Sequence, residues 1–138
     1  MSRGVARVVY EFGRFVLVGA VGFIVDGGAL MLLIHGVGFS PIWSRIPSFL
    51  VAVTVTWWLH RHFTFTRIRG VAPSFAEWLR FVTGNAVGNA ANLTIYWVLL
   101  GVVGWSPLIA LAVASVVATG VNYTMSARWV FVPSRRED

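Results

Sequence analysis

Positions Phe15 to His35 read FVLVGAVGFIVDGGALMLLIH, and Asp26 is the only charged residue among them. A membrane-spanning helix needs about 20 mainly apolar residues in a row. This stretch meets that requirement, and three later stretches meet it as well: Ile42–His60, Phe81–Val103 and Pro107–Met125. The sequence therefore predicts an all-α membrane protein with four transmembrane helices.

The composition of the whole chain agrees with a membrane protein. Of its 138 residues, 57% are hydrophobic and only 12% are charged, whereas about a quarter of a typical soluble domain is charged. Cysteine is absent, which excludes a disulfide framework and a thiolate metal site. The net charge of +6 comes from arginines near the ends of the apolar stretches. We therefore expect membrane lipids as partners, and no nucleic acid.

The arginines are distributed unevenly between the two ends of the predicted helices. Nearly all of them fall at one end: Arg3, Arg7, Arg14, Arg61, Arg67, Arg69, Arg80, Arg128, Arg135 and Arg136. The opposite end carries only Arg45. Because basic residues accumulate on the cytoplasmic side of a membrane protein, we expect both termini and the central polar loop to be cytoplasmic.

The two pairs of predicted helices are copies of one unit. A shift of 66 residues aligns residues 11–65 with residues 77–131 without a gap. The matches include Glu11/Glu77, Arg14/Arg80, Phe15/Phe81, Gly22/Gly88, Ser40/Ser106, Pro41/Pro107 and Phe65/Phe131. Since each copy has two spans, both copies have the same orientation and the repeat is parallel. The sequence thus predicts a single membrane domain, residues 1–138, with a cytoplasmic linker at residues 66–76.

Short motifs at the helix ends resemble those of a known family. The motif residues are Arg14, Phe15, Val18 and Gly19 at the first entry, Arg61, Phe63, Thr64 and Phe65 at the second exit, Arg80 and Phe81 at the third entry, and Asn122, Arg128, Trp129, Val130 and Phe131 at the last exit. Together with the size and topology, they resemble the GtrA family of small four-span bacterial membrane proteins. The resemblance implies a place in the bacterial cytoplasmic (inner) membrane and a role in cell-surface polysaccharide synthesis.

Asp26 is the one acid inside a predicted span. An ionised carboxylate at mid-membrane costs on the order of 3 kcal/mol on insertion scales, so we interpret Asp26 as a functional group that binds a sugar or a proton. Its repeat counterpart, Asn92, is expected at the same depth. The alternative is a structural hydrogen bond from Asp26 that holds two helices together.

Four arginines at the cytoplasmic end are candidate ligands for a lipid phosphate. Arg14 and Arg80 open the first and third spans at matching positions, where a cation beside free helix N–H groups suits a phosphate. Arg61 and Arg128, at the exits of the second and fourth spans, would complete a cationic collar. The alternative for each is that it only anchors the topology.

Arg45 is the fifth candidate phosphate ligand, at the outer end of the second span. There it would meet a phosphate in the outer leaflet, or simply extend to the interface. Asp26 should lie about 9 Å away along the membrane normal, at 1.5 Å of rise per residue. The two side chains would therefore pair only if both were extended.

Polar side chains follow one face of the third and fourth spans. These residues are Asn85, Asn89 and Asn92 on the third span, and Ser115, Thr119, Asn122 and Ser126 on the fourth. The four asparagines are candidate ligands for sugar hydroxyls, and the alternative is that they hold the helices together. His60 and His62 are expected to be solvated at the interface and to bind no metal.

Three functions follow as hypotheses. The first, which the resemblance to the GtrA family implies, is a translocase that flips a polyprenyl-phosphate-linked sugar across the membrane. Because four helices enclose little volume, we expect a homodimer or a larger assembly. The second, which the resemblance also allows, is a non-catalytic membrane anchor or scaffold for a glycosyltransferase. The third is a small drug/proton exporter, although such exporters rely on glutamate. No nucleophile–base pair or paired carboxylates appear, so we expect neither an enzyme nor a cofactor.

Overall fold

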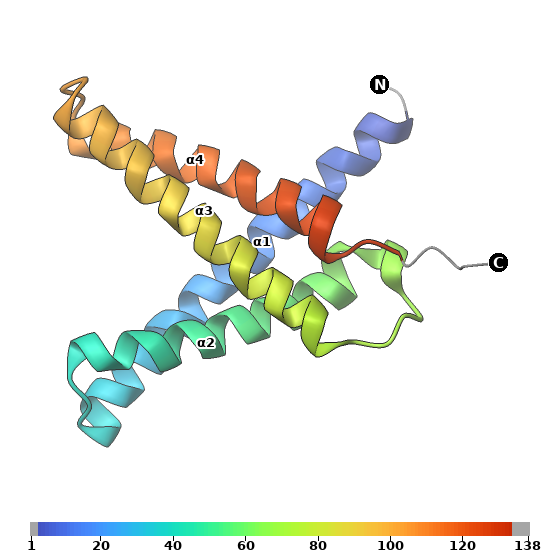
Figure 1. The fold of residues 1–138 in the computed structure, drawn as a ribbon, viewed down its shortest axis with the longest axis horizontal. Coiled ribbons are helices and arrows are strands. Elements are labelled where there is room, and N and C mark those ends of the chain that lie inside the picture. The colour runs from blue at the N-terminus through green and yellow to red at the C-terminus, as the bar shows by residue number, and fades with distance from the viewer. Residues whose placement is uncertain (1–2, 134–138) are drawn as a thin grey trace. The chain divides into compact units, whose positions relative to one another are not determined.

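The computed structural model describes residues 3–133, except the side chains at positions 41, 42, 107, 108 and 111. Within this range the chain forms four long α-helices: α1 (Arg3–Met31), α2 (Pro41–Leu59), α3 (Phe75–Gly101) and α4 (Pro107–Met125) (Figure 1). Short helical turns follow them: η1 (Leu32–Val37), η2 (His60–Thr64), η3 (Thr66–Ile68) and η4 (Ser126–Val130). Residues 3–133 contain no strand, which confirms the predicted all-α class. Arg135 and Arg136, used to predict the orientation, lie outside the described residues.

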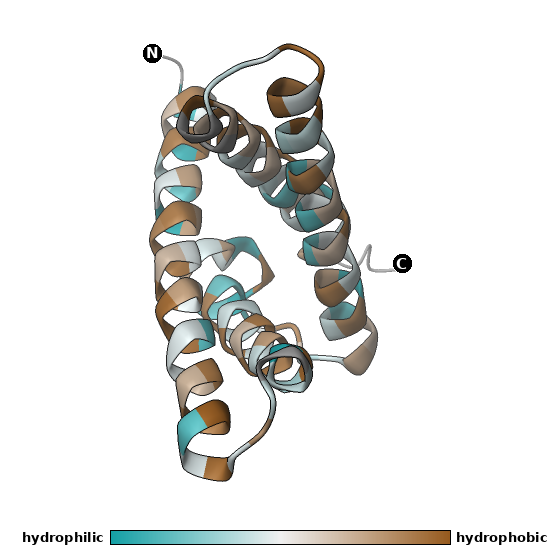
Figure 2. Ribbon diagram, turned by 90° about the vertical axis from the view of Figure 1, so that its left-hand side faces the viewer, coloured by the Kyte–Doolittle hydropathy of each residue, from teal (hydrophilic) through white to brown (hydrophobic). Residues whose placement is uncertain are grey.

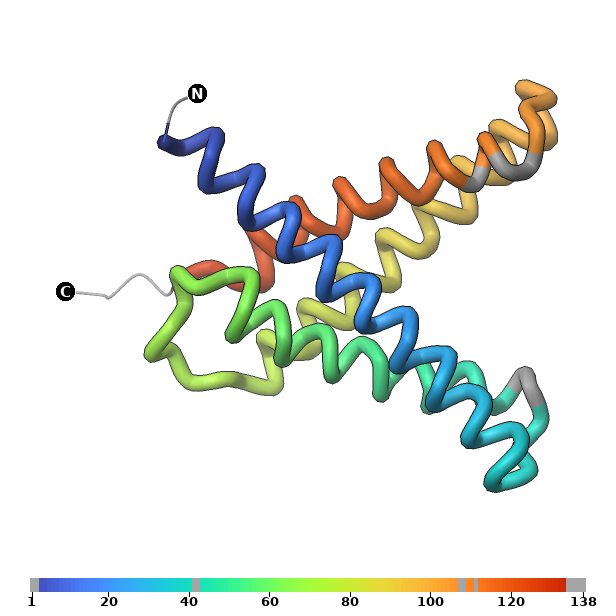
Figure 3. Tube along the Cα trace, turned by 180° about the vertical axis from the view of Figure 1, so that it is seen from behind, coloured from blue at the N-terminus to red at the C-terminus, as the bar shows by residue number. Residues whose placement is uncertain are grey.

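The chain divides into two compact units. The first extends to Ala72 and contains the hairpin of α1 and α2, whereas the second begins at Pro73 and contains the hairpin of α3 and α4. In each hairpin the two helices run side by side and are joined by a short turn (Figure 3). The boundary between the units falls within the predicted linker at residues 66–76. Each hairpin therefore corresponds to one copy of the sequence repeat.

The turns at the tips of the two hairpins have the same backbone conformation. Gly38 has a φ angle of 83° and Gly104, 66 positions later, has a φ angle of 75°. Glycine reaches this left-handed region without the steric cost that a Cβ imposes. After each glycine, a backbone N–H closes the turn: that of Phe39 donates to the Leu33 carbonyl oxygen at 3.0 Å, and that of Trp105 makes the equivalent bond at 2.9 Å. The two copies of the repeat therefore share the backbone geometry of their turns as well as their sequence.

A glycine brings the two helices of each hairpin together. A Cβ placed on Gly22 of α1 would overlap the methyl group of Thr56 on α2. In the second unit, a Cβ on Gly88 of α3 would overlap the side-chain amide of Asn122 on α4. The shift of 66 residues relates Gly22 to Gly88 and Thr56 to Asn122. Small residues at such positions allow close backbone approach, as in many membrane helix pairs.

Aromatic side chains fill the other end of each hairpin. In the first unit, the rings of Phe15 and Phe65 lie 6.3 Å apart in an edge-on arrangement. In the second, the rings of Phe81 and Phe131 lie 5.7 Å apart. Phe65 and Phe131 are completely buried. These pairs join the first helix of a unit to the segment that follows its second helix, and so close the hairpin at that end.

Two of the helices extend beyond the predicted spans. α1 begins at Arg3 and α3 begins at Phe75, each several residues before its apolar stretch. The spans were predicted from apolar residues alone, but a helix continues until its end is capped. At the start of α3, the Ser74 hydroxyl accepts a hydrogen bond from the Glu77 backbone N–H at 3.1 Å. This N-cap satisfies one of the free N–H groups at the end of the helix and fixes where it begins.

One described helix, α1 continued by η1 (Arg3–Val37), passes a test for membrane crossing that is based on length and apolar composition. Its outer surface is strongly apolar, since Phe23 is 82% exposed and Ile24 is 72% exposed. Hydrophobic residues also recur along the other helices (Figure 2). Apolar surface of this extent on the outside of a protein marks a site of contact with lipid or with another protein.

Candidate functional site

The ion pair between Asp26 of α1 and Arg45 of α2 is the most distinctive polar contact of the first unit. Nη1 of Arg45 donates to Oδ2 of Asp26 at 3.0 Å. The sequence allowed this pairing only with both side chains extended, and the structure shows that the pair forms. The Arg45 side chain is 54% exposed and that of Asp26 is 22% exposed. The pair is therefore open on the arginine side and enclosed on the aspartate side.

The second oxygen of Asp26 differs from the first. Oδ1 is buried and accepts no hydrogen bond from any residue in the described range. A buried carboxylate oxygen without a donor is costly, because desolvation is not compensated. The pair thus leaves one acceptor unsatisfied on Asp26 and several N–H donors of Arg45 open to the surroundings.

The equivalent position of the second unit has a neutral contact. There, Nδ2 of Asn92 on α3 donates to the hydroxyl of Ser115 on α4 at 3.4 Å. Asn92 is the counterpart of Asp26, whereas the counterpart of Arg45 is Leu111. Both partners of the ion pair are consequently changed together in the second copy, and the helices there are joined by an amide–hydroxyl contact.

Arg14 is held tightly within the first unit. Its Nη1 donates to the Phe63 carbonyl oxygen and its Nη2 donates to the Tyr10 hydroxyl, each at 2.7 Å. The guanidinium carbon also lies over both rings, 4.5 Å from the centre of Tyr10 and 4.6 Å from that of Phe63. Cation–π contacts and charge-assisted hydrogen bonds of this kind fix the orientation of an arginine. Arg14 therefore links the middle of α1 to η2, which follows α2.

Arg80 occupies the matching position of the second unit but has different surroundings. The side chain is half-buried, and its Nε atom is buried with no hydrogen-bond partner in the described part of the chain. Tyr10 and Phe63, whose rings flank Arg14, correspond to Ala76 and Trp129 in the second unit. The two arginines that match in sequence therefore differ in structure: Arg14 has internal partners, while Arg80 has an unsatisfied donor.

Arg61 and Arg128 complete the predicted collar in sequence, but the structure places them differently. Arg61 is only 3% exposed, and its Nη2 donates to the Val71 carbonyl oxygen at 2.6 Å. This bond ties the linker to the end of α2. Arg128, on η4, is exposed. The lipid-phosphate roles of both residues stay predictions, and Arg61 has a clear role in packing.

A second contact holds the linker against the first unit. Nη1 of Arg67 lies 3.6 Å from Oε1 of Glu11 on α1, and the Glu11 side chain is 10% exposed. The sequence singled out Glu11 only as a repeat match with Glu77, and the pairing with Arg67 was not predicted. The spacing along the chain contains no signal for it, because the contact depends on how the linker folds back after η2.

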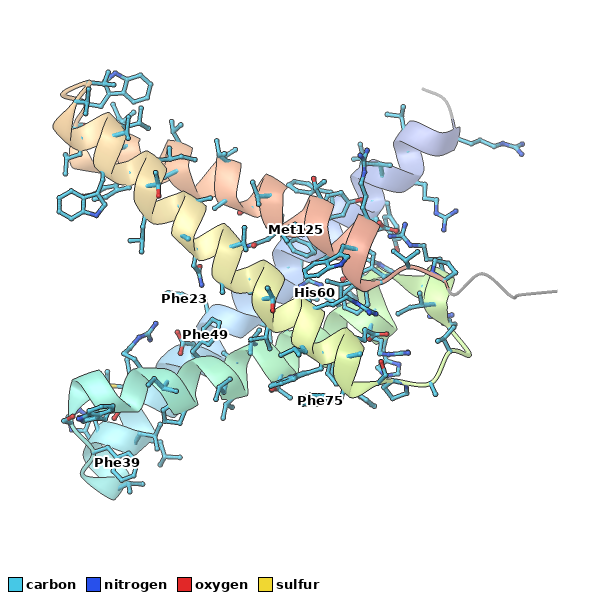
Figure 4. All side chains as sticks on the ribbon, viewed as in Figure 1. Phe23, Phe39, Phe49, His60, Phe75 and Met125 are labelled. Carbon is cyan, nitrogen blue, oxygen red and sulfur yellow. The ribbon has the colours of Figure 1, made fainter. Side chains whose placement is uncertain are left out.

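The prediction that His60 is solvated is wrong. His60 is 2% exposed. Its ring stacks on that of Phe15, with centroids 4.3 Å apart and an interplanar angle of 15°. Nδ1 lies 3.0 Å from the Thr64 hydroxyl. Figure 4 shows His60 at the end of α2 opposite to the turn that carries Phe39. The close return of η2 over the start of α1 encloses this ring, whereas His62 remains exposed as expected.

The candidate sugar-binding asparagines of the second unit have separate environments. Nδ2 of Asn85 donates to the Phe81 carbonyl oxygen of its own helix at 3.0 Å. Asn89 is exposed. Asn122 packs against Gly88, and its Oδ1 is buried without a donor among the residues that the structure describes. Asn92 joins α3 to α4, which is the packing role considered for it. Asn89 thus remains the member most open to a ligand.

Comparison with protein families gives one match. The model of the GtrA/DPMS transmembrane domain matches residues 14–131, which is most of the chain. The matched region begins at Arg14 and ends at the buried Phe131, so it includes every candidate site residue and both hairpins except the first part of α1. A comparison with curated proteins gave no match.

Proposed function

Because the chain belongs to the GtrA/DPMS transmembrane-domain family, it is a membrane protein with a part in membrane-associated glycan synthesis, and we propose that it flips a polyprenyl-phosphate-linked sugar across the bacterial cytoplasmic membrane. It does so as a four-span protein with both termini and the linker in the cytoplasm. Three features support the proposal: the arginines near the helix ends, the polar side chains inside the predicted spans and the apolar surface of the helices.

The observation that carries the proposal is the placement of arginines at both ends of the α1–α2 hairpin. Arg14 contacts Phe63 beyond the end of α2, and Arg45 lies near its start. Arg45 and Phe63 are roughly 25 Å apart along the axis of α2, at 1.5 Å of rise per helical residue. That separation is close to the ~30 Å thickness of the hydrocarbon core. A lipid phosphate would therefore find an arginine at either membrane surface.

Polar side chains inside the spans are the proposed contacts for the sugar. Asp26 has a buried acceptor, Oδ1, without a donor among the described residues, and Asn89 is exposed. Both residue types bind hydroxyl groups through oxygen and amide atoms. Arg80, with its unsatisfied Nε, is the second phosphate ligand on the cytoplasmic side. A homodimer supplies the enclosed volume that one short hairpin pair lacks.

A flipping assay tests this function directly. The chain is reconstituted into vesicles with a labelled polyprenyl-phosphate sugar, and access of an outside reagent to the label is followed over time. We expect wild type to expose the inner-leaflet label, and Arg45→Gln to slow this at least tenfold. Arg69→Gln is the matched control, because Arg69 is an exposed linker arginine. Wild-type rates equal to those of empty vesicles would refute the translocase.

A scaffold for a glycosyltransferase is the second candidate, favoured by an exposed apolar patch at the start of α3. Phe75 is 73% exposed and Leu79 is 49% exposed, and the Phe75 ring stacks with Trp78 at 5.4 Å. Such a patch beside the linker suits a protein partner. Co-purification of a membrane glycosyltransferase that is lost in Phe75→Ser, combined with no flipping by the wild type, would replace the translocase with this function.

A further inference from the structure

The geometry of the Asp26–Arg45 pair leaves most of the arginine available. A guanidinium has five N–H donors in a planar fork, and this fork matches the oxygens of a phosphate in a bidentate manner. In the pair, Nη1 of Arg45 contacts Oδ2 of Asp26 at 3.0 Å, and the Arg45 side chain is 54% exposed. An anion can therefore approach the remaining donors of Arg45 from outside the hairpin.

The aspartate side of the pair is incompletely satisfied. Oδ1 of Asp26 is buried and has no donor among the described residues. A monodentate pair with an unsatisfied oxygen is weaker than a bidentate one, because the desolvation of the carboxylate is only partly compensated. A phosphate, with more oxygens and more charge, is a stronger partner for the same guanidinium.

Comparison of the two hairpins shows whether a charged pair is needed to join their helices. In the second unit the helices are joined at the equivalent depth by Asn92 and Ser115, which are both uncharged. The counterpart of Arg45 there is Leu111. Joining two helices of this fold therefore requires no charged pair. The charges of the first unit need a further reason, and an exposed arginine beside an acid suggests exchange with an anion.

We propose that Asp26 is an internal counter-ion that competes with the phosphate of a polyprenyl lipid for Arg45, so that phosphate binding opens the Asp26–Arg45 ion pair. This inference rests on the proposed function and specifies how its outer phosphate site is regulated. Without ligand, Asp26 neutralises Arg45 within the apolar surroundings. When the phosphate leaves, Asp26 takes its place and so favours release of the lipid.

A double-mutant cycle on the full chain in nanodiscs tests the competition. Binding of a radiolabelled polyprenyl monophosphate is measured for wild type, Asp26→Asn, Arg45→Gln and the double variant. We expect Asp26→Asn to bind up to roughly fivefold more tightly, the factor that corresponds to the upper end of the range for a partly exposed ion pair. We expect Arg45→Gln to bind more weakly, and Asp26→Asn to have no effect in the Arg45→Gln background. That last comparison excludes a simple effect of net charge.

Additional ligands identify the group that is recognised. Unphosphorylated polyprenol should bind all four proteins equally. If inorganic phosphate displaces the labelled lipid from wild type and fails to do so from Arg45→Gln, the phosphate alone opens the pair. Displacement by phosphatidylglycerol with the same pattern would extend the site to ordinary phospholipids. Asp26→Ser repeats the test if Asp26→Asn does not fold, as judged by thermal unfolding.

The outcomes distinguish this inference from the function on which it rests. If wild type binds the polyprenyl phosphate but Asp26→Asn binds it equally or more weakly, the competition is refuted and the translocase stands. The same holds if Asp26→Asn tightens binding even without Arg45. If wild type binds no polyprenyl phosphate and flips no lipid, the proposed function fails and the competition fails with it.

Discussion

Gly88 lies directly against the side-chain amide of Asn122, and the same shift of 66 residues relates this contact to that between Gly22 and Thr56. A glycine therefore lies against the partner helix at the same place in both hairpins. At one of these places the neighbour is a threonine and at the other an asparagine with a buried, unsatisfied Oδ1. The repeat is conserved between the two copies in packing, while the polar groups along the helices differ.

Substitution at the helix crossings should destabilise the fold. We expect Gly88→Ala to lower the free energy of unfolding by about 1–3 kcal/mol, because the added methyl group overlaps Asn122. Gly19→Ala is the control, since a Cβ there meets nothing within 4 Å and the gain in helix propensity is the same. Thermal unfolding followed by tryptophan fluorescence in detergent measures the difference. Equal melting temperatures for the two variants would contradict the close contact between Gly88 and Asn122.

The two matching arginines should respond differently to a change that keeps their charge. Arg14→Lys removes the planar group that lies between Tyr10 and Phe63 and at least one hydrogen bond. We expect a loss of about 1–2 kcal/mol of stability. Arg80→Lys is the matched control and should leave the melting temperature nearly unchanged. An equal loss in both variants would show that the contacts of Arg14 with Tyr10 and Phe63 do not stabilise the hairpin specifically.

The ion pair between Glu11 and Arg67 should protect the linker from proteolysis. Glu11→Gln weakens the contact at 3.6 Å that holds the linker to α1. We expect trypsin to cleave several-fold faster after Arg69, which is exposed, because local opening becomes easier. Mass spectrometry of the fragments over time gives the rate. Asp26→Asn removes an acid elsewhere in the same unit and should not change cleavage; faster cleavage in both variants would point to general destabilisation instead.

Part of the fold follows from patterns in the sequence. The 66-residue repeat relates the turn glycines Gly38 and Gly104, and the structure gives both of them positive φ angles. The approach of Asp26 and Arg45 follows only in part, because helical rise placed them about 9 Å apart along the membrane normal and allowed pairing only with both side chains extended. Such features depend on the regular geometry of helices, which the sequence encodes locally.

Other parts of the site depend on irregular segments and could not be predicted. The π-helical turn η2 brings Phe63 against Arg14 and encloses His60. An extra residue in a helical turn changes which side chains face inward, and no motif marks it in advance. The different environments of Arg14 and Arg80 have another origin, because η4 is also a π-helical turn, 66 residues after η2. They accompany a change of neighbours, since the counterpart of Tyr10 is Ala76, which has no ring or hydroxyl. Tyr10, four residues before Arg14 on α1, was the one local signal for the contacts of that arginine.

The central claim is that arginines of this chain hold the phosphate of a polyprenyl lipid. A structure of the protein with a bound polyprenyl-phosphate sugar, determined by electron cryomicroscopy in a nanodisc, tests it most directly. We expect the phosphate within hydrogen-bond distance of the guanidinium of Arg45, Arg14 or Arg80, with the Asp26–Arg45 pair open when Arg45 is the ligand. A phosphate that contacts none of these three arginines would contradict the claim.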